Sequence, residues 1–162
     1  MKKTVTAVIK TIREMQKGNA EKRLAGEFLA YDDDRQTLRM RFPVLEWELN
    51  SRGVMHGMVV SGILDDIMGK LSNDITRELY APSGSMYIDF IAPVRLGEHL
   101  IVEARVVYEG KRLIRMHSEA RLESSGKLAA QADGTYIPVT FRPIAAQDTA
   151  EENQARREEE RP

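Results

Sequence analysis

The sequence has no cysteine, only three histidines and almost no net charge, and these shortages exclude several kinds of function. Without cysteine the chain forms no disulfide, binds no metal through a thiolate and has no cysteine nucleophile. A formal net charge of −1 gives no general attraction to nucleic acid or to an anionic membrane. We therefore expect neither of these partners, and we expect local chemistry to select the ligand.

Long apolar runs are also missing. The first ten residues are basic and then apolar, but Lys10 and Arg13 interrupt the run before a signal-peptide core, or a membrane span of about 20 residues, could form. This pattern predicts a cytoplasmic protein. A chain of 162 residues has the usual length of one domain and can bury about two-thirds of its unfolded surface around a single core.

Apolar spacing predicts two helices. Residues 4–17 carry apolar side chains at helical spacing, which indicates an amphipathic N-terminal helix. The segment from Gly57 to about Ser72 is apolar nearly all round, so this second helix belongs in the interior. Between them, two short strand-like runs at 26–31 and 37–42 flank an acidic turn and predict a hairpin.

After the second helix the apolar period changes to two, which indicates half-buried antiparallel strands. These long strands are predicted over residues 99–108, 114–122 and 128–139. In the last strand, Ala130, Ala132 and Gly134 form a small-residue face that leaves room for a helix against the sheet. Strands of about ten residues are long enough to curl around a helix of four turns.

The two ends of the chain differ from its middle. The last twenty residues are highly charged and lack apolar positions to bury, so they are expected to be solvated. We therefore divide the chain into an N-terminal helix (1–20), one folded domain (21–142) and a charged C-terminal tail (143–162).

Two adjacent carboxylates in the second helix have different neighbours. Asp66 precedes Lys70 by four residues, which predicts an ion pair at the edge of the surface. Asp65 has no cation within one turn of its own helix, so nothing there offsets the cost of burying it. A carboxylate in such a setting can act as a general base or a nucleophile near neutral pH. The structural alternative is that Asp65 bonds to backbone amides or to Ser and Thr hydroxyls.

His56 and Gly57 stand where this helix is expected to begin. Unpaired amides at a helix start carry the positive end of the helix dipole, and they can stabilise the oxyanion that develops from a carbonyl group. Because Gly57 has no side chain, it allows a carbonyl group to approach its amide closely. His56 by itself is equally consistent with a hydrogen-bonded loop histidine.

The arrangement Asn50-x-x-Gly53-x-x-His56-Gly57, with Asp65 nine residues after the histidine, resembles a known family. It is similar to the hot-dog-fold acyl-CoA thioesterases of the phenylacetic-acid-degradation type, in the 4-hydroxybenzoyl-CoA thioesterase-like superfamily. The resemblance covers roughly residues 20–140. It implies an α+β hot-dog fold, in which a long antiparallel sheet wraps around a central helix.

The resemblance also implies roles for individual residues. Asn50 would orient the carbonyl group or the attacking water, although residues 50–53 also read as a simple turn. Ser83, ten residues before Pro93, would hold that water. Ser85 is the competitor for this role, and both serines are expected on the same face of one strand. Met58 stands where the family commonly has a second glycine, and it would narrow the acyl pocket.

Cations at expected loops and turns could hold the phosphates of CoA. We assign this role to Arg95, Lys111 and Arg112, for which a solvated turn charge is the alternative. The histidines show no spacing typical of metal ligands, and there is no glycine-rich phosphate loop. The sequence therefore predicts neither a metal nor a cofactor.

Together these features predict an acyl-CoA thioesterase that releases a carboxylic acid and CoA. The resemblance implies a homodimer or a dimer of dimers (a homotetramer), with Asp65 and Ser83 facing the partner subunit's Asn50, His56 and Gly57. Two alternatives stay open. A hot-dog dehydratase or hydratase would show a Pro-containing loop and a longer separation between histidine and acid. A non-catalytic acyl-CoA-binding module would not need Asp65.

Overall fold

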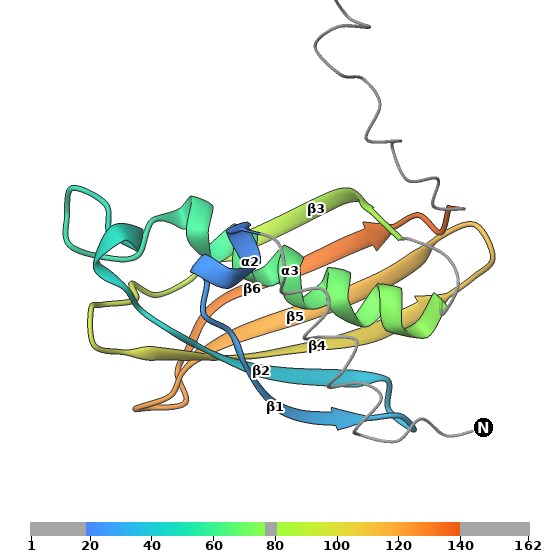
Figure 1. Ribbon diagram of the computed structural model, residues 1–162, viewed down its shortest axis with the longest axis horizontal. Helices are drawn as coiled ribbons and strands as arrows, with labels where there is room; N and C mark the ends of the chain where they lie inside the picture. Colours follow the sequence, from blue (N-terminus) through green and yellow to red (C-terminus); the bar gives the residue numbers. More distant parts are fainter. Residues whose placement is uncertain (1–18, 77–80, 140–162) are drawn as a thin grey trace, which may run out of the picture.

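The computed structural model describes residues 19–76 and 81–139, in which a six-stranded sheet lies against one long helix (Figure 1). The elements are helix α2 (Asn19–Arg23), strands β1 (Glu27–Asp32) and β2 (Thr37–Pro43), the 3-10 helix η1 (Glu46–Glu48), helix α3 (Gly57–Thr76), and strands β3 (Ser83–Phe90), β4 (His99–Glu109), β5 (Ile114–Leu122) and β6 (Leu128–Tyr136). The strand order is β1-β2-β4-β5-β6-β3, and all neighbouring strands are antiparallel. The predicted α+β hot-dog fold is confirmed.

The core lies between helix α3 and the face of the sheet that the alternation predicts. In β4 the side chains of Leu100, Val102 and Ala104 are buried, and in β5 those of Ile114 and Met116 are buried. Helix α3 contributes a broad apolar face to the same core, formed by Val59, Val60, Ile63, Leu64, Ile67, Met68 and Leu71. Complete burial of one such side chain stabilises the fold by about 1.5–3 kcal/mol.

Small residues in β6 bring the helix close to the sheet, as the sequence predicts. A Cβ atom on Gly134 would lie 2.9 Å from Cε2 of Tyr136 and 3.3 Å from Cε of Met68. The absence of a side chain at Gly134 therefore makes space for the Tyr136 ring and for the Met68 side chain of α3. This space places the Tyr136 ring under the middle of the helix.

Strand β3 is one of the two edges of the sheet, and it is irregular at its start. Ser83 pairs with Tyr136, whereas Ser85 pairs with Thr135, so Gly84 forms a bulge. Paired residues of antiparallel strands share a face. Ser83 consequently lies on the α3 side with Tyr136, and Ser85 lies on the opposite side. The prediction that both serines share a face is wrong, because the bulge changes the alternation between them.

Both ends of the predicted domain division lie largely outside the part of the chain that the structure describes. The helix expected over residues 4–17 and the tail over 143–162 lie outside the described residues. Helix α2 (Asn19–Arg23) spans the division that we expected at residue 20. Near this helix, the Arg23 guanidinium lies over the Trp47 ring, 4.7 Å from its centroid, and so joins α2 to η1.

Candidate active site

The start of helix α3 is organised by His56. The Met58 amide donates a hydrogen bond to Nδ1 of His56 at 3.0 Å, so the ring acts as an N-terminal cap. Because Nδ1 accepts this bond, the neutral ring carries its proton on Nε2. The His56 backbone amide also donates to the Glu48 carbonyl at 2.7 Å, which fixes the helix start against η1. His56 is exposed, which leaves Nε2 accessible to a ligand.

Gly57 is the first residue of α3, and its amide finds no acceptor among the described residues. A Cβ atom at this position would lie 3.4 Å from the ring of Phe90, so the end of β3 approaches the helix start closely. A cavity of about 370 Å³ adjoins them, lined by Met55, Gly57, Val60, Phe90, Ile91, Ala92, Pro93, Val94 and Ala129. The predicted oxyanion-stabilising amide therefore borders an apolar cavity.

Asn50 organises the turn that precedes this helix. Its Oδ1 accepts hydrogen bonds from the amides of Arg52 at 2.9 Å and of Val54 at 3.4 Å. The backbone of Asn50 also bonds to Gly53 and Val54. The turn alternative is thus confirmed for this residue, and its role with a carbonyl group or a water stays a prediction. Only the NH₂ group of the Asn50 side chain is left to contact a ligand.

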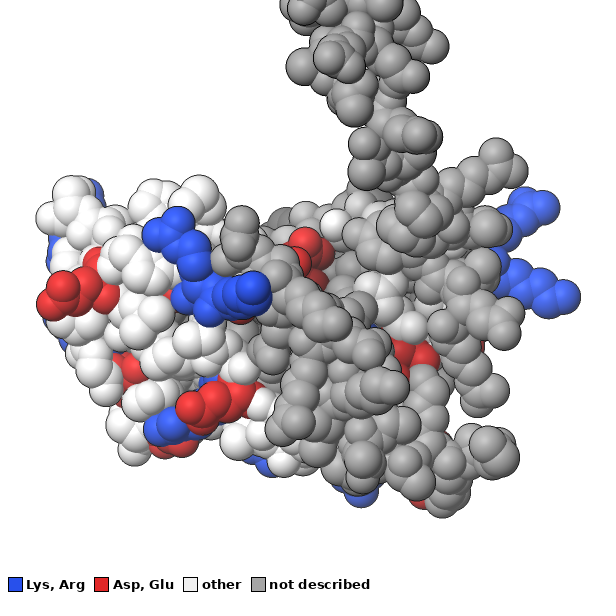
Figure 2. Space-filling view, in the orientation of Figure 1, with Lys and Arg blue, Asp and Glu red and all other residues white. Residues whose placement is uncertain are grey.

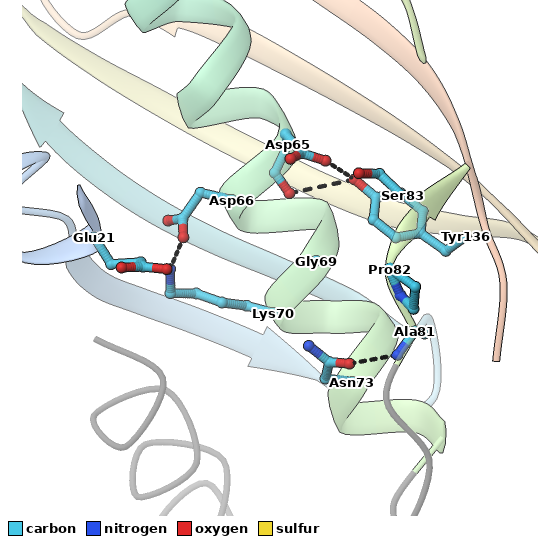
Figure 3. A pocket seen from close by; sticks show the side chains of 10 residues that line it. All are labelled: Glu21, Asp65, Asp66, Gly69, Lys70, Asn73, Ala81, Pro82, Ser83 and Tyr136. Atoms are coloured by element: carbon cyan, nitrogen blue, oxygen red, sulfur yellow. Dashed lines mark hydrogen bonds and ion pairs between the residues drawn. The ribbon is translucent and has the colours of Figure 1, made fainter. Parts of the chain in front are cut away.

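Asp65 lies in the middle of α3 and is bound by Tyr136. The Tyr136 hydroxyl lies 2.8 Å from Oδ1 of Asp65 and 3.2 Å from its backbone carbonyl oxygen (Figure 3). Among the residues that the structure describes, no donor reaches Oδ2. Burial and the nearby Asp65 charge raise the pKa of Tyr136, so the phenol remains a donor at neutral pH. Asp65 therefore has one held oxygen and one free oxygen.

Asp66 forms the predicted ion pair with Lys70, but the pair is not at the surface. The Asp66 and Lys70 side chains are only 12% and 2% exposed. Lys70 follows the buried Ile67 and Ile63 by about one and two turns, so its stem lies on the packed side of α3. Burial raises the pKa of Asp66, which Lys70 opposes. The expectation of a surface-edge pair is therefore wrong.

Asp65 and Ser83 border the same cavity, which has a volume of about 360 Å³. It is lined by Glu21, Asp65, Asp66, Gly69, Lys70, Asn73, Ala81, Pro82, Ser83 and Tyr136 (Figure 3). Asn73 accepts a hydrogen bond from the Ala81 amide at 2.8 Å and so holds the start of the β3 segment beside the helix. The structure thus joins Asp65 with Ser83, and it leaves Asn50, His56 and Gly57 at the far end of α3.

Sequence reasoning missed Tyr136 and Glu21 as members of this cavity. Tyr136 is an even number of residues away from Ala130, Ala132 and Gly134, so it lies on the same face of β6. We predicted that this face packs against the helix. Extending that alternation by one step would have pointed Tyr136 at α3. No sequence signal indicated that Glu21, on the short helix α2, would come near Lys70.

The cations assigned to CoA phosphates do not lie together in one chain. Arg95 precedes β4, and Lys111 and Arg112 follow it. The 11 residues of that strand separate its ends by roughly 35 Å. Arg95 is thus separated from Lys111 and Arg112 within a single subunit, and the role of these cations in binding phosphate stays a prediction. All three residues are exposed, as are Met58 and Ser85. Acidic and basic side chains are interspersed over the described part of the face seen in Figure 2.

Within residues 19–76 and 81–139, no three His, Cys, Asp or Glu side chains are grouped so that they could hold a metal ion. His117 instead contacts Asp133, with Nδ1 and Oδ1 2.9 Å apart. No helix in the described part of the chain is long and apolar enough to cross a membrane.

Comparison with known proteins identifies the family. Residues 52–129, which include the start of α3 and Asp65, match the thioesterase superfamily. The match covers just under half of the chain, which is similar to that superfamily over this segment. Acyl-coenzyme A thioesterase 13 of Homo sapiens is 25% identical over 135 residues, which are 81% of this chain and 96% of the relative. The protein is thus a thioester hydrolase, and Asp65 lies within the segment that defines its family.

Solved structures share the fold of this thioesterase. The Escherichia coli PaaI protein from the phenylacetic acid degradation operon has a TM-score of 0.74 and 20% identity, covering 83% of this chain and 94% of its own. Zebrafish thioesterase superfamily member 2 has a TM-score of 0.74 and 22% identity, covering 84% and 99%. A Streptococcus mutans protein bound to acetyl CoA has a TM-score of 0.65 and 20% identity, covering 72% and 90%.

Proposed function

We propose that this thioesterase hydrolyses acyl-CoA to a carboxylic acid and free CoA. The relative in Homo sapiens is an acyl-coenzyme A thioesterase, and a structure with the same fold was solved with acetyl CoA. In the reaction a water oxygen attacks the thioester carbon, the carbon–sulfur bond breaks, and the CoA thiolate takes up a proton. The catalyst must therefore activate water and stabilise the oxyanion that develops on the carbonyl group.

The observation that carries this proposal is the arrangement of Asp65 beside Ser83. Oδ1 of Asp65 is held by Tyr136, and Oδ2 is free of described donors in a cavity that Ser83 borders. Such a carboxylate can accept a proton from a water that the serine hydroxyl positions, or it can attack the carbonyl carbon itself. Within one subunit a serine nucleophile lacks a histidine base, since none of the described residues that line this cavity is a histidine.

The oxyanion donor comes from the partner subunit in this proposal. Gly57 and Asp65 are eight residues apart on α3, which is about 12 Å along the helix axis. They border different cavities. One thioester group cannot bridge that distance, so a complete site needs a Gly57 amide from elsewhere.

Edge strand β3 provides the means to supply that amide. It carries exposed Tyr87 and Phe90, and an open edge of this kind invites pairing with another strand. Antiparallel pairing of two β3 strands about a two-fold axis places the start of one beside the end of the other. Since Phe90 at the end of β3 contacts Gly57, the partner subunit's Gly57 would then approach Ser83 and Asp65.

The same symmetry brings the separated cations toward one site. Lys111 and Arg112 lie at the end of the sheet where Ile114 pairs with Tyr136, next to Ser83. Arg95 lies at the Gly57 end, where its backbone pairs with Val54. In the proposed dimer, the partner subunit's Arg95 therefore comes nearer to Lys111 and Arg112 than the Arg95 of the same chain. These cations would hold the CoA phosphates.

Release of free thiol from a panel of short, medium and aromatic acyl-CoAs tests the function directly. We expect hydrolysis of at least one class, with stoichiometric free acid. Formation of an enoyl or hydroxyacyl product without free thiol would identify a dehydratase or hydratase. Tight binding of acyl-CoA with no turnover would identify a binding module.

A further inference from the structure

We propose that Tyr136 is a positioning residue that holds the Asp65 carboxylate in its reactive orientation. This inference rests on the proposed function, because it assigns Tyr136 a role in the same hydrolysis. It goes further by explaining how a carboxylate on a helix can present one chosen oxygen to a water.

The hydrogen-bond geometry supports this role. The Tyr136 hydroxyl is 2.8 Å from Oδ1 of Asp65 and 3.2 Å from the backbone carbonyl oxygen of the same residue. The hydroxyl has one proton, so its main hydrogen bond is the shorter one to Oδ1, and this bond restricts rotation about the Asp65 side-chain bonds. Oδ2 is left directed away from this bond and free of described donors. A general base gains efficiency when its reacting atom is held in this way.

Tyr136 is itself firmly held. Its side chain is 1% exposed and is the largest fully buried side chain in the described chain. The ring lies over the bare Cα of Gly134, where a Cβ atom would come within 2.9 Å of it, and near Gly69 of α3. Tyr136 also pairs with Ser83 on one neighbouring strand and with Ile114 on the other. The hydroxyl thus reaches Asp65 from a rigid support.

The other charged groups around the cavity do not replace this hydrogen bond. Asp66 and Glu21 are acidic and cannot donate to Asp65 when ionised. Among the described residues that line the cavity, Lys70 is the only cation, and its ammonium group is paired with Asp66. Ser83 faces the cavity from β3 without a hydrogen bond to Asp65 among the described contacts. Tyr136 is therefore the one described donor to this carboxylate.

Tyr136→Phe tests the proposal, because it removes the hydroxyl and keeps the ring that fills the core. We expect kcat to fall about tenfold, as for losing one hydrogen bond worth roughly 1.4 kcal/mol in the transition state, with little change in KM. The loss should appear equally in kcat and in kcat/KM, because the hydrogen bond acts on the reacting carboxylate and not on substrate binding. Tyr31→Phe removes a phenol that bonds to Asp33 and Asp74 and does not line this cavity, and it should change neither value.

A double variant separates positioning from a general structural effect. If Tyr136 acts through Asp65, then Tyr136→Phe should cost nothing further in kcat when Asp65 is already Asn. A wild-type enzyme without thioesterase activity would refute the proposed function. An active wild type together with an unchanged kcat in Tyr136→Phe would instead overturn this inference alone. Independent losses that multiply in the double variant would overturn it as well.

Discussion

Gly57 and Asp65 lie on one helix, eight residues apart, and border two different cavities. Among the described residues, no acceptor reaches the Gly57 amide at the helix start, and no donor reaches Oδ2 of Asp65 two turns later. Thioester hydrolysis needs both the amide and the carboxylate at one site, but the rise of an α-helix keeps them about 12 Å apart. This separation is the reason why the account requires two subunits.

Asp65→Asn should lower kcat for thioester hydrolysis by about 10²-fold or more, because it removes the positioned base and leaves a side chain of the same shape. The expected loss is in turnover rather than in unfolding free energy, since the Tyr136 hydroxyl can still donate to the amide oxygen. Steady-state kinetics together with chemical denaturation check both parts. Full activity in this variant would remove Asp65 from the mechanism.

The Asp66–Lys70 pair should show its importance in stability. Lys70→Met alone, or Asp66→Leu alone, leaves one buried charge without its partner, which should lower the free energy of unfolding by about 3 kcal/mol. The double variant replaces both charges by apolar side chains and should regain most of the loss. Urea denaturation of the four proteins measures the coupling. Additive losses would contradict a buried, mutually dependent pair.

Glu48 should make stability depend on pH. The side chain is 1% exposed, Oε1 has no partner among the described residues, and burial raises its pKa above the usual value. When a carboxyl group has a higher pKa in the folded state, its contribution to the free energy of unfolding is fully present below the pKa of the unfolded state. That contribution is lost as pH rises through the folded pKa.

Glu48→Gln should therefore gain stability relative to the wild type as pH increases from about 4.5 toward neutrality, with a constant difference at higher pH. The glutamine oxygen can still accept the Leu45 amide hydrogen bond, which is 2.9 Å long in the wild type. Thermal unfolding of both proteins across this range provides the comparison. A difference that is independent of pH would show that Glu48 does not titrate between the two states.

Tyr87→Lys should weaken the dimer without damaging the subunit. Tyr87 is 69% exposed on edge strand β3 and lies opposite Asp133, so a lysine fits the isolated chain. A charge on an edge strand opposes pairing with a second strand. Analytical ultracentrifugation should show more monomer, and specific activity should fall in parallel at low protein concentration. A fully active monomer would show that β3 pairing is not needed.

Much of this fold follows from periodicity alone. The alternation of Leu100, Val102 and Ala104 identified the buried face of β4, and the apolar run from Gly57 identified the central helix. Such patterns are predictable because burial repeats along an element with the period of its backbone. The joining of Asp65 with Ser83 was implied by the family resemblance rather than by these periods.

Features that depend on a single residue or on tertiary neighbours were not predictable in this way. The bulge at Gly84 turns Ser85 away from Ser83. The hydrophobic alternation of the sequence does not reveal such a one-residue change of register. The burial of Lys70 depends on how α3 packs in the fold. The spacing of Asp66 and Lys70 in the sequence does not provide this information. By contrast, the distance between Arg95 and Lys111 could have been predicted, because the strand expected over residues 99–108 already separates them.

The shared site can be tested with two purified heterodimers whose subunits carry different affinity tags. The first combines an Asp65→Asn subunit with a Gly57→Val subunit, in which the new side chain blocks the approach to the amide. The second carries both changes on one subunit beside a wild-type partner. Wild-type subunits bearing the same two tags set the reference rate of acyl-CoA hydrolysis.

A site that uses Asp65 of one subunit and the partner subunit's Gly57 predicts opposite results for these two proteins. The first heterodimer keeps one intact site of two and should have about half of the wild-type rate, whereas the second keeps none and should be inactive. The reverse pattern, an inactive first heterodimer and a half-active second, would place the whole site within one chain and contradict the account.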